Sequence, residues 1–308
     1  MVEQDAVPVA PPPADAVTEA TLLRRDGPLY LDHFGLREAP FSITPDTDFV
    51  FSSAGHQEAL NTLLVALSSG EGFVKITGDV GTGKTLLCRR LLATLDRERF
   101  VTAYLPNPAL GPRTLLLALA EELGMPVAEA MQADEYHLLK ALRHALLDVA
   151  RSGRSTVVCL DEAQAMPLES LETLRLVSNL ETEKRKLLHL VMFGQPELDE
   201  RLAEPGIRQL KQRISFHYRL AGLTRQELAN YVAHRLRIAG QRDRGGAVFT
   251  GRAVTGLHRA SDGIPRLANI LAHKALLAAF GEGSDTVAWR HVRRAARDTE
   301  GARALFWW

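Results

Sequence analysis

Five short apolar runs, separated by longer stretches with helical periodicity, constrain the fold of this chain more than any other feature. The runs are FVKIT, VTAYL, TVVCL, LHLVMF and SFHYRL, at residues 73–77, 101–105, 156–160, 188–193 and 215–220. They are apolar on both faces, as in parallel strands that helices cover on each side. Helical patterns lie between them, over residues 85–95, 114–123, 135–151 and 168–183. This alternation predicts an α/β protein, an αβα sandwich around a five-stranded parallel sheet.

The strand pattern ends after Leu220, and the rest of the chain is typical of helices. TRQE at Thr224 forms a capping box before an apolar series. Further helical patterns run over residues 251–260, 265–280 and 286–298. We therefore expect an α/β nucleotide-binding domain at residues 29–220 and a small all-helical lid domain at residues 221–299.

The two ends of the chain differ from the rest in composition. Residues 1–28 are rich in Pro and Ala without apolar periodicity, which predicts a disordered tail. Residues 300–308 end in Phe306, Trp307 and Trp308, an aromatic tail that could dock on a partner, anchor at a membrane interface or fill a groove of its own domain. The N-terminus lacks a signal-peptide pattern and no apolar stretch approaches the roughly 18 residues of a membrane span. These features predict a cytoplasmic location.

The overall charge and the cysteines add two further expectations. Lys plus Arg and Asp plus Glu both number 37, so net charge gives no general reason to bind nucleic acid or an anionic membrane. Cys88 and Cys159 lie in apolar segments, which predicts free buried thiols in a reducing compartment.

The segment GDVGTGKT follows the first strand pattern and begins a helical pattern. It matches G-x-x-x-x-G-K-[ST], in which backbone N–H groups and a helix N-terminus hold phosphates. Lys84 would reach the β- and γ-phosphates, and the Thr85 hydroxyl would bind Mg²⁺. The residues expected to hold ATP are Gly78, Asp79, Val80, Gly81, Thr82, Gly83, Lys84, Thr85 and Leu86.

A pair of acidic residues in TVVCLDEAQ ends the third strand pattern. The carboxyl ends of parallel strands are where open α/β sheets bind ligands. Asp161 would hold Mg²⁺ through water, and Glu162 would orient and polarise the water that attacks the γ-phosphate. Paired acids at this place also cap helices, but the upstream phosphate motif favours catalysis. The sequence therefore predicts Mg²⁺-dependent ATP hydrolysis.

The order of these motifs resembles that of an AAA+ ATPase over almost all of the chain from Tyr30 to Asp298. YLDHFGLREAPFSITPDTDFVFSSAGHQEAL, GDVGTGKTLLCRRLL and LVMFGQPEL resemble the ExeA/GspA group of secretion ATPases, and are most similar to the MshM-like ATPases of MSHA-type (type IV) pilus biogenesis. ExeA-type proteins carry a membrane span and a periplasmic peptidoglycan-binding domain after the ATPase. The end of this sequence at Trp308 favours the shorter MshM-like form.

The resemblance implies roles for further residues. Gln195 matches sensor 1, which contacts the γ-phosphate or the attacking water, and Arg266 in GIPR matches sensor 2. Arg213 matches the arginine finger that reaches a neighbouring subunit's site, with Arg208 as the competing candidate. Each residue also has a simpler interpretation. Gln195 would be a polar residue at a strand end, Arg266 a solvated arginine at a helix start, and Arg213 or Arg208 a member of a surface ion pair. A finger in trans implies a homo-oligomer, commonly a hexameric ring in this superfamily.

Three functions remain open at this point. The first is an ATPase acting as an accessory motor or switch in pilus or type II secretion assembly, in the cytoplasm or peripheral to the inner membrane. The second is a DNA-associated AAA+ regulator of the transposition or helicase-loader type, and the third is a scaffold that binds ATP with negligible turnover. The run Arg290, Arg293, Arg294 and Arg297 is either a nucleic-acid or lipid patch or a solvated helix face. The sequence has no fixed signature for the adenine contacts; Ile43 and residues 44–46 precede the core and are the candidates for them.

Overall fold

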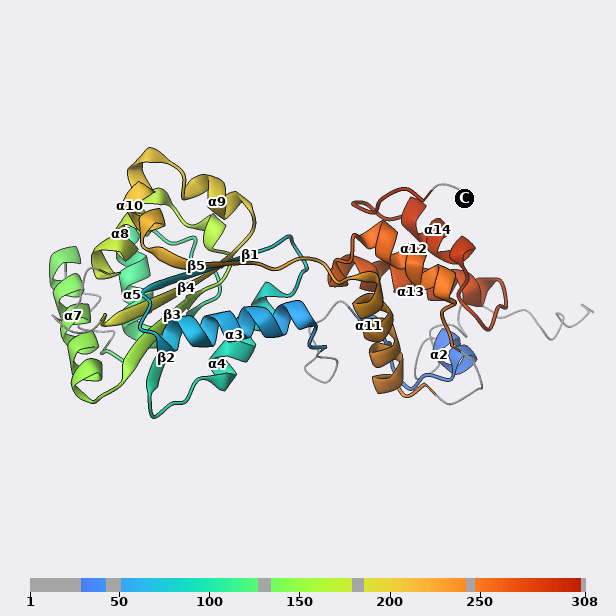
Figure 1. The fold of residues 1–308 in the computed structure, drawn as a ribbon, viewed down its shortest axis with the longest axis horizontal. Helices are drawn as coiled ribbons and strands as arrows, with labels where there is room; N and C mark the ends of the chain where they lie inside the picture. Colours follow the sequence, from blue (N-terminus) through green and yellow to red (C-terminus); the bar gives the residue numbers. More distant parts are fainter. Residues whose placement is uncertain (1–28, 43–50, 127–133, 179–185, 242–246, 306–308) are drawn as a thin grey trace, which may run out of the picture.

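The computed structural model describes residues 29–42, 51–126, 134–178, 186–241 and 247–305, apart from the side chain of Arg208. Figure 1 shows an α/β part and a helical part lying side by side, with the chain crossing between them after the last strand. The proposed tail at residues 1–28, Ile43 with residues 44–46, and the aromatic residues 306–308 lie outside the described residues.

The predicted five-stranded parallel sheet is confirmed. Its strands are β1 (Phe73–Thr77), β2 (Phe100–Leu105), β3 (Ser155–Leu160), β4 (Leu188–Gly194) and β5 (Ile214–Arg219), in the order β2-β3-β4-β1-β5. All four strand pairings are parallel. Because β4 pairs with both β1 and β3, the loops that follow these three strands emerge next to one another at the carboxyl edge of the sheet.

Helices cover both faces of this sheet, since successive side chains of a strand point to opposite faces. On one face α3 (Ala54–Ser68) and α4 (Lys84–Thr94) pack against alternate strand residues such as Ile76 and Phe193. On the other face Leu190 and Met192 belong to a core that includes residues of several helices. These are α5 (Pro112–Glu122), α7 (Glu135–Arg151), α8 (Leu168–Ser178), α9 (Glu197–Arg201) and α10 (Arg208–Gln212). The last five predicted residues of the 168–183 helix lie outside the described part of the chain.

The helical region that follows β5 has a hydrophobic core separate from the two faces of the sheet. It contains α11 (Arg225–Ile238), α12 (Gly251–Ser261), α13 (Pro265–Gly281) and α14 (Trp289–Arg297). Thr224 and Glu227 form the expected capping box at the start of α11. The last helix starts three residues later than its sequence pattern, because Val287 forms a β-bridge with Phe249. No described helix has the length and apolarity needed to cross a membrane.

A segment before the α/β part packs into the helical region. The short helix α2 (Leu29–Phe34) and the turn after it bury Tyr30, Phe34 and Phe41 in the core of α11 to α14. Buried Arg235 of α11 donates to the carbonyl oxygen of Pro40 at 2.5 Å. This segment therefore packs against the helices that follow β5, although the domain expected from sequence at residues 29–220 includes it.

Candidate nucleotide site

The loop of GDVGTGKT joins β1 to α4 and depends on glycine for its conformation. Gly81 and Gly83 have φ angles of 84° and 99°, in the region that L-residues with a Cβ rarely adopt. Asp79 and Val80 are exposed at the outer turn of the loop, whereas Thr82 is buried and donates its hydroxyl to the carbonyl oxygen of Asp79 at 2.8 Å. The loop is therefore a tight turn, closed by the hydroxyl and the backbone N–H of Thr82 on the carbonyl oxygen of Asp79.

The start of α4 offers backbone donors to this loop. Its N-cap is Gly83, which has no side chain to cap the first turn, so the N–H groups of that turn can bind an anion. Thr85 and Leu86 are half-buried in that first turn. Such a terminus binds phosphate through N–H groups and the helix dipole.

Lys84 lies folded over the loop. Its ammonium group donates to the carbonyl oxygens of Gly78 and Asp79 at 2.8 and 3.0 Å. Burial lowers the pKa of Lys84, whereas the carboxylates of Glu162 and Asp161 act in the opposite direction. A cation held this way can exchange carbonyl oxygens for phosphate oxygens with little movement of its side chain.

Thr85 and Asp161 meet where α4 begins and β3 ends. The Thr85 hydroxyl donates to Oδ2 of Asp161 at 2.6 Å, and Oδ1 accepts from the backbone N–H of Glu162 at 3.0 Å. Asp161 is only 2 % exposed. In the described chain no three His, Cys, Asp or Glu residues cluster as a metal site. A hydroxyl beside one carboxylate nevertheless suits Mg²⁺, which keeps water and phosphate oxygens as its other ligands.

Glu162 is held by two glutamine side chains. Its Oε2 accepts from Nε2 of Gln164 at 2.6 Å and from Nε2 of Gln195 at 3.1 Å. Its backbone is left-handed, with a φ of 51°, a strain of the kind found at functional sites. Burial opposes ionisation, but the two amide donors and the charge of Lys84 prevail and lower the pKa of Glu162. The carboxylate is thus ionised and fixed in direction.

Gln164 also fixes Gln195, and the sequence reasoning did not single it out. Its Oε1 accepts from the backbone N–H of Gln195 at 3.0 Å, while its Nε2 donates to Glu162. One amide thereby ties the loop after β3 to the loop after β4. Gln164 is the last residue of the motif DEAQ, but only the strand order shows that the loop after β3 lies beside the loop after β4.

Arg266 comes from the helical region and lies against the phosphate loop. It is the second residue of α13, and its backbone N–H is directed at the carbonyl oxygen of Gly81 at 3.3 Å. Its side chain is exposed. The helical region therefore contacts the loop directly through Arg266, the residue that the resemblance assigns to sensor 2.

His56 is a second residue at this site that the sequence reasoning missed. It is 8 % exposed, and its Nδ1 lies 2.7 Å from Oγ of Ser53. Its Nε2 faces the phosphate loop so closely that a Cβ on Gly83 would stand 2.6 Å away. Burial lowers the pKa of His56. The nearby backbone of Thr82 raises this pKa, but by less than burial lowers it. The imidazole therefore supports the back of the loop, but no sequence spacing marks it.

Arg213 lies apart from the residues above. It caps α10 directly before β5, and Ile214 pairs with Phe73 at the amino end of β1. The phosphate loop follows Thr77 at the other end, which pairs with Arg219. A strand of this length spans roughly 20 Å, so Arg213 does not share the site of its own chain.

Comparisons with known proteins agree with this fold. Residues 67–202 match the family model of an AAA domain. The Aeropyrum pernix ORC2 protein in ADPNP–ADP complexes superposes with a TM-score of 0.59 at 22 % identity, over 87 % of this chain and 73 % of that one. The Thermotoga maritima RuvB Holliday junction branch migration motor gives a TM-score of 0.53 at 16 % identity, over 83 % and 72 %. Fold and matched domain define the class, an AAA+ P-loop ATPase.

Within this class the chain is similar to General secretion pathway protein A of Aeromonas hydrophila. The two are 42 % identical over 275 residues, which is 89 % of this chain and 49 % of the relative. The expected resemblance to the ExeA/GspA group is thereby confirmed, and the chain spans about half the length of this relative.

Proposed function

We propose that the protein binds Mg-ATP at the loop of residues 78–85 and hydrolyses it. The observation that carries this proposal is the position of Glu162, an ionised carboxylate pinned by Gln164 and Gln195 beside Lys84. A group that orients attacking water needs a charged acceptor with a fixed direction, which this arrangement provides.

Each residue of the site then has a part in the reaction. Lys84 leaves its two carbonyl acceptors and binds the β- and γ-phosphates, while the N–H groups of α4 hold the phosphate chain. Thr85 and Asp161 hold Mg²⁺, which when bound neutralises charge on the phosphates. Glu162 accepts a hydrogen bond from water and aims it at the γ-phosphorus. Gln195 and Arg266 approach the γ-phosphate from β4 and from the helical region.

We further propose that the site is completed by a second subunit. Arg213 stands at the opposite edge of the sheet from its own loop, so an arginine finger at this residue can serve only a neighbouring copy. This geometry supports the proposal of a homo-oligomer, which we expect to be a hexameric ring. Arg208, five residues earlier in the sequence, is the second candidate for the finger.

The role that fits best is an accessory motor or switch in a type II secretion or MSHA-like type IV pilus assembly. Its support is the similarity to a protein named for the general secretion pathway. In this role the protein would act on the cytoplasmic side of the inner membrane, where ATP is available, and its partners would be components of the assembly.

The substitution Glu162→Gln tests the proposal. It keeps the size and the hydrogen-bonding capacity of the side chain but removes the charge that polarises water. We expect ATP binding to be retained and hydrolysis to fall to background, measured by calorimetry and phosphate release. Unchanged hydrolysis would refute the assigned role of Glu162. Affinity isolation of this variant with ATP should then recover assembly components, and recovery of DNA alone would argue for the regulator instead.

A further inference from the structure

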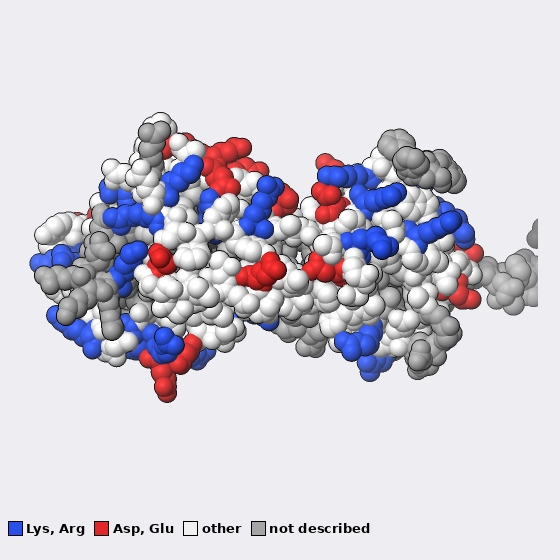
Figure 2. Space-filling view, in the orientation of Figure 1, with Lys and Arg blue, Asp and Glu red and all other residues white. Residues whose placement is uncertain are grey.

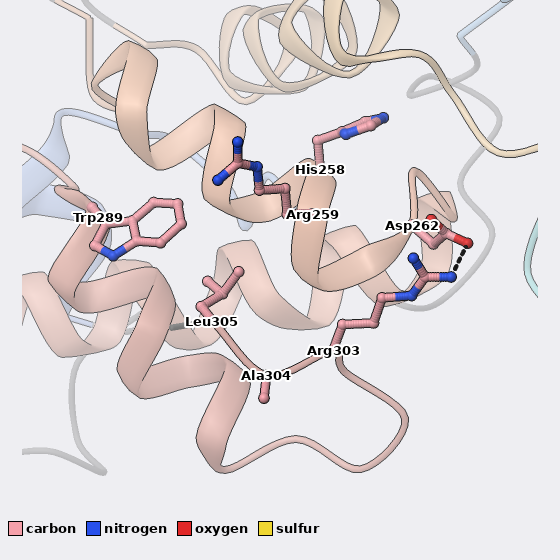
Figure 3. A pocket seen from close by; sticks show the side chains of 7 residues that line it. All are labelled: His258, Arg259, Asp262, Trp289, Arg303, Ala304 and Leu305. Carbon is pink, nitrogen blue, oxygen red and sulfur yellow. Dashed lines mark hydrogen bonds and ion pairs between the residues drawn. The ribbon is translucent and has the colours of Figure 1, made fainter. Parts of the chain in front are cut away.

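Two neighbouring hollows open on the helical region and share one wall, Trp289. The first, here the arginine hollow, measures about 800 Å³ and is lined by Arg225, Arg252, Arg290 and Trp289 with Thr250 and Thr255. The second measures about 370 Å³ and contains Arg259 and Arg303. Figure 2 shows basic side chains gathered on this part of the molecule, and Figure 3 shows the second hollow from close by.

The arginines of the first hollow come from the beginnings of three helices. Arg225 is the first residue of α11, Arg252 the second of α12 and Arg290 the second of α14. A helix N-terminus carries partial positive charge, so a cation is destabilising there. Three such placements around one hollow cost stability, and a bound anion would offset that cost.

Among the described residues that line the arginine hollow there is no carboxylate to offset this charge. In the described part of the chain no Asp or Glu pairs with Arg225 or Arg252. Arg290 is held from outside the hollow by Glu282, whose Oε2 lies 2.9 Å from its Nε. A merely solvated face would be expected to interleave both signs of charge. The concentration of one sign favours an anionic ligand.

Trp289 gives the surface an aromatic element between the basic groups. Its ring lies against α12 at Gly256, where an added Cβ would stand 2.8 Å from the indole. Figure 3 shows Arg259 directed toward Trp289, whereas Arg303 turns to its partner Asp262 at 2.8 Å. An aromatic ring flanked by arginines is the combination that single-stranded nucleic acid uses, since bases stack on the ring and guanidinium groups bind phosphates.

We propose that the arginine hollow and Trp289 bind a strand of single-stranded nucleic acid. Arg225, Arg252 and Arg290 contact successive phosphates, and Trp289 stacks with a base. Three separate guanidinium groups around a shallow hollow, with an aromatic ring beside them, suit the phosphates and bases of a strand. This surface lies on the helical region and involves none of the residues placed in the nucleotide site.

The structure also divides the arginine run of the last helix. Arg290 belongs to the hollow, and Arg294 and Arg297 are exposed on the same side of α14 at helical spacing. Arg293 is half-buried instead, with Nε enclosed by protein. Only part of this run is therefore available to a ligand.

Fluorescence anisotropy with a labelled oligothymidylate tests the proposal on the full-length protein. We expect salt-dependent binding with a logarithmic slope of about two, because three neutralised phosphates release counterions. The double variant Arg225→Gln/Arg252→Gln should bind about tenfold or more weakly and lose about two thirds of the slope, because two of the three phosphate contacts are removed. Both side chains are exposed, so the fold and ATP binding should not change.

A charge-matched control separates this site from general electrostatics. Arg97 and Arg237 are exposed and lie elsewhere on the chain, so Arg97→Gln/Arg237→Gln should keep the affinity of the unmodified protein. Equal loss in both double variants would overturn the proposal. Absence of oligothymidylate binding, or tighter binding of polyglutamate or phosphatidylglycerol vesicles at the same salt concentration, would also overturn it.

Discussion

The backbone N–H of Arg266 faces the carbonyl oxygen of Gly81 at 3.3 Å, which joins the helical region to the phosphate loop. The two residues are packed so closely that a Cβ on Gly81 would stand 2.5 Å from Cβ of Arg266. The first turn of α13 therefore packs directly against the loop that we propose binds phosphate. The contact gives the expected sensor 2 residue a physical route for coupling nucleotide binding to helix movement.

Replacement of Gly81 by Ala should break this contact. The new methyl group clashes with Arg266, and the φ of 84° costs a residue with a Cβ about 1–2 kcal/mol. We expect ATP affinity to fall about tenfold or more, measured by calorimetry, together with a lower Tm. Gly281→Ala in α13 meets open space and has an ordinary φ, so it should change neither quantity. Equal behaviour of the two variants would contradict the coupling.

Gln164→Ala should slow hydrolysis while ATP still binds. Without this amide, Glu162 loses its 2.6 Å donor and the backbone N–H of Gln195 loses its acceptor. Because the carboxylate is then free to turn away from water, kcat should fall about tenfold to a hundredfold with little change in KM. The exposed Gln226→Ala in α11 serves as control in the same assay. A change confined to KM would show that Gln164 acts on binding rather than on the orientation of Glu162.

Much of this candidate site could be expected from sequence, through local pattern for the loop and the acids and through the AAA+ resemblance for the amide. The GDVGTGKT loop, the acids after β3 and the amide after β4 each follow a strand, and parallel topology brings the ends of β1, β3 and β4 together. What could not be predicted depends on contacts distant in sequence. Nothing near His56 in the sequence shows that it supports Gly83, and nothing near Tyr30 shows that it packs with α11 to α14. Such contacts are set by the packing of whole elements.

Arg213→Ala should abolish hydrolysis without weakening ATP binding. An arginine finger contributes about a thousandfold or more to phosphoryl transfer, and the residue lies far from its own loop. Lys211→Ala, an exposed neighbour in α10, is the control for lost charge.

Mixing inactive Arg213→Ala protein with inactive Glu162→Gln protein should restore part of the activity, because some interfaces then combine an intact finger with an intact Glu162. Arg208→Ala protein, mixed with Glu162→Gln protein in place of Arg213→Ala, distinguishes the two finger candidates. If Arg208 were the finger, Arg208→Ala alone would be inactive and would recover activity in this mixture. Absence of recovery in every mixture would exclude a shared site.

His56 should make the stability of the protein depend on pH. Burial holds its pKa below the ordinary value of about 6.5, so the folded state binds fewer protons than the unfolded state in this range. This contribution is complete above about pH 7 and is lost as pH falls through the ordinary value toward the lowered one. His56→Gln cannot titrate, so its free energy of unfolding, measured with urea, should decline less between about pH 7.5 and about pH 5.5. The pKa values of His189 and His273 are also lowered by burial, so part of the decline remains. An identical decline in both proteins would mean that His56 is already protonated, or solvated, in the folded state.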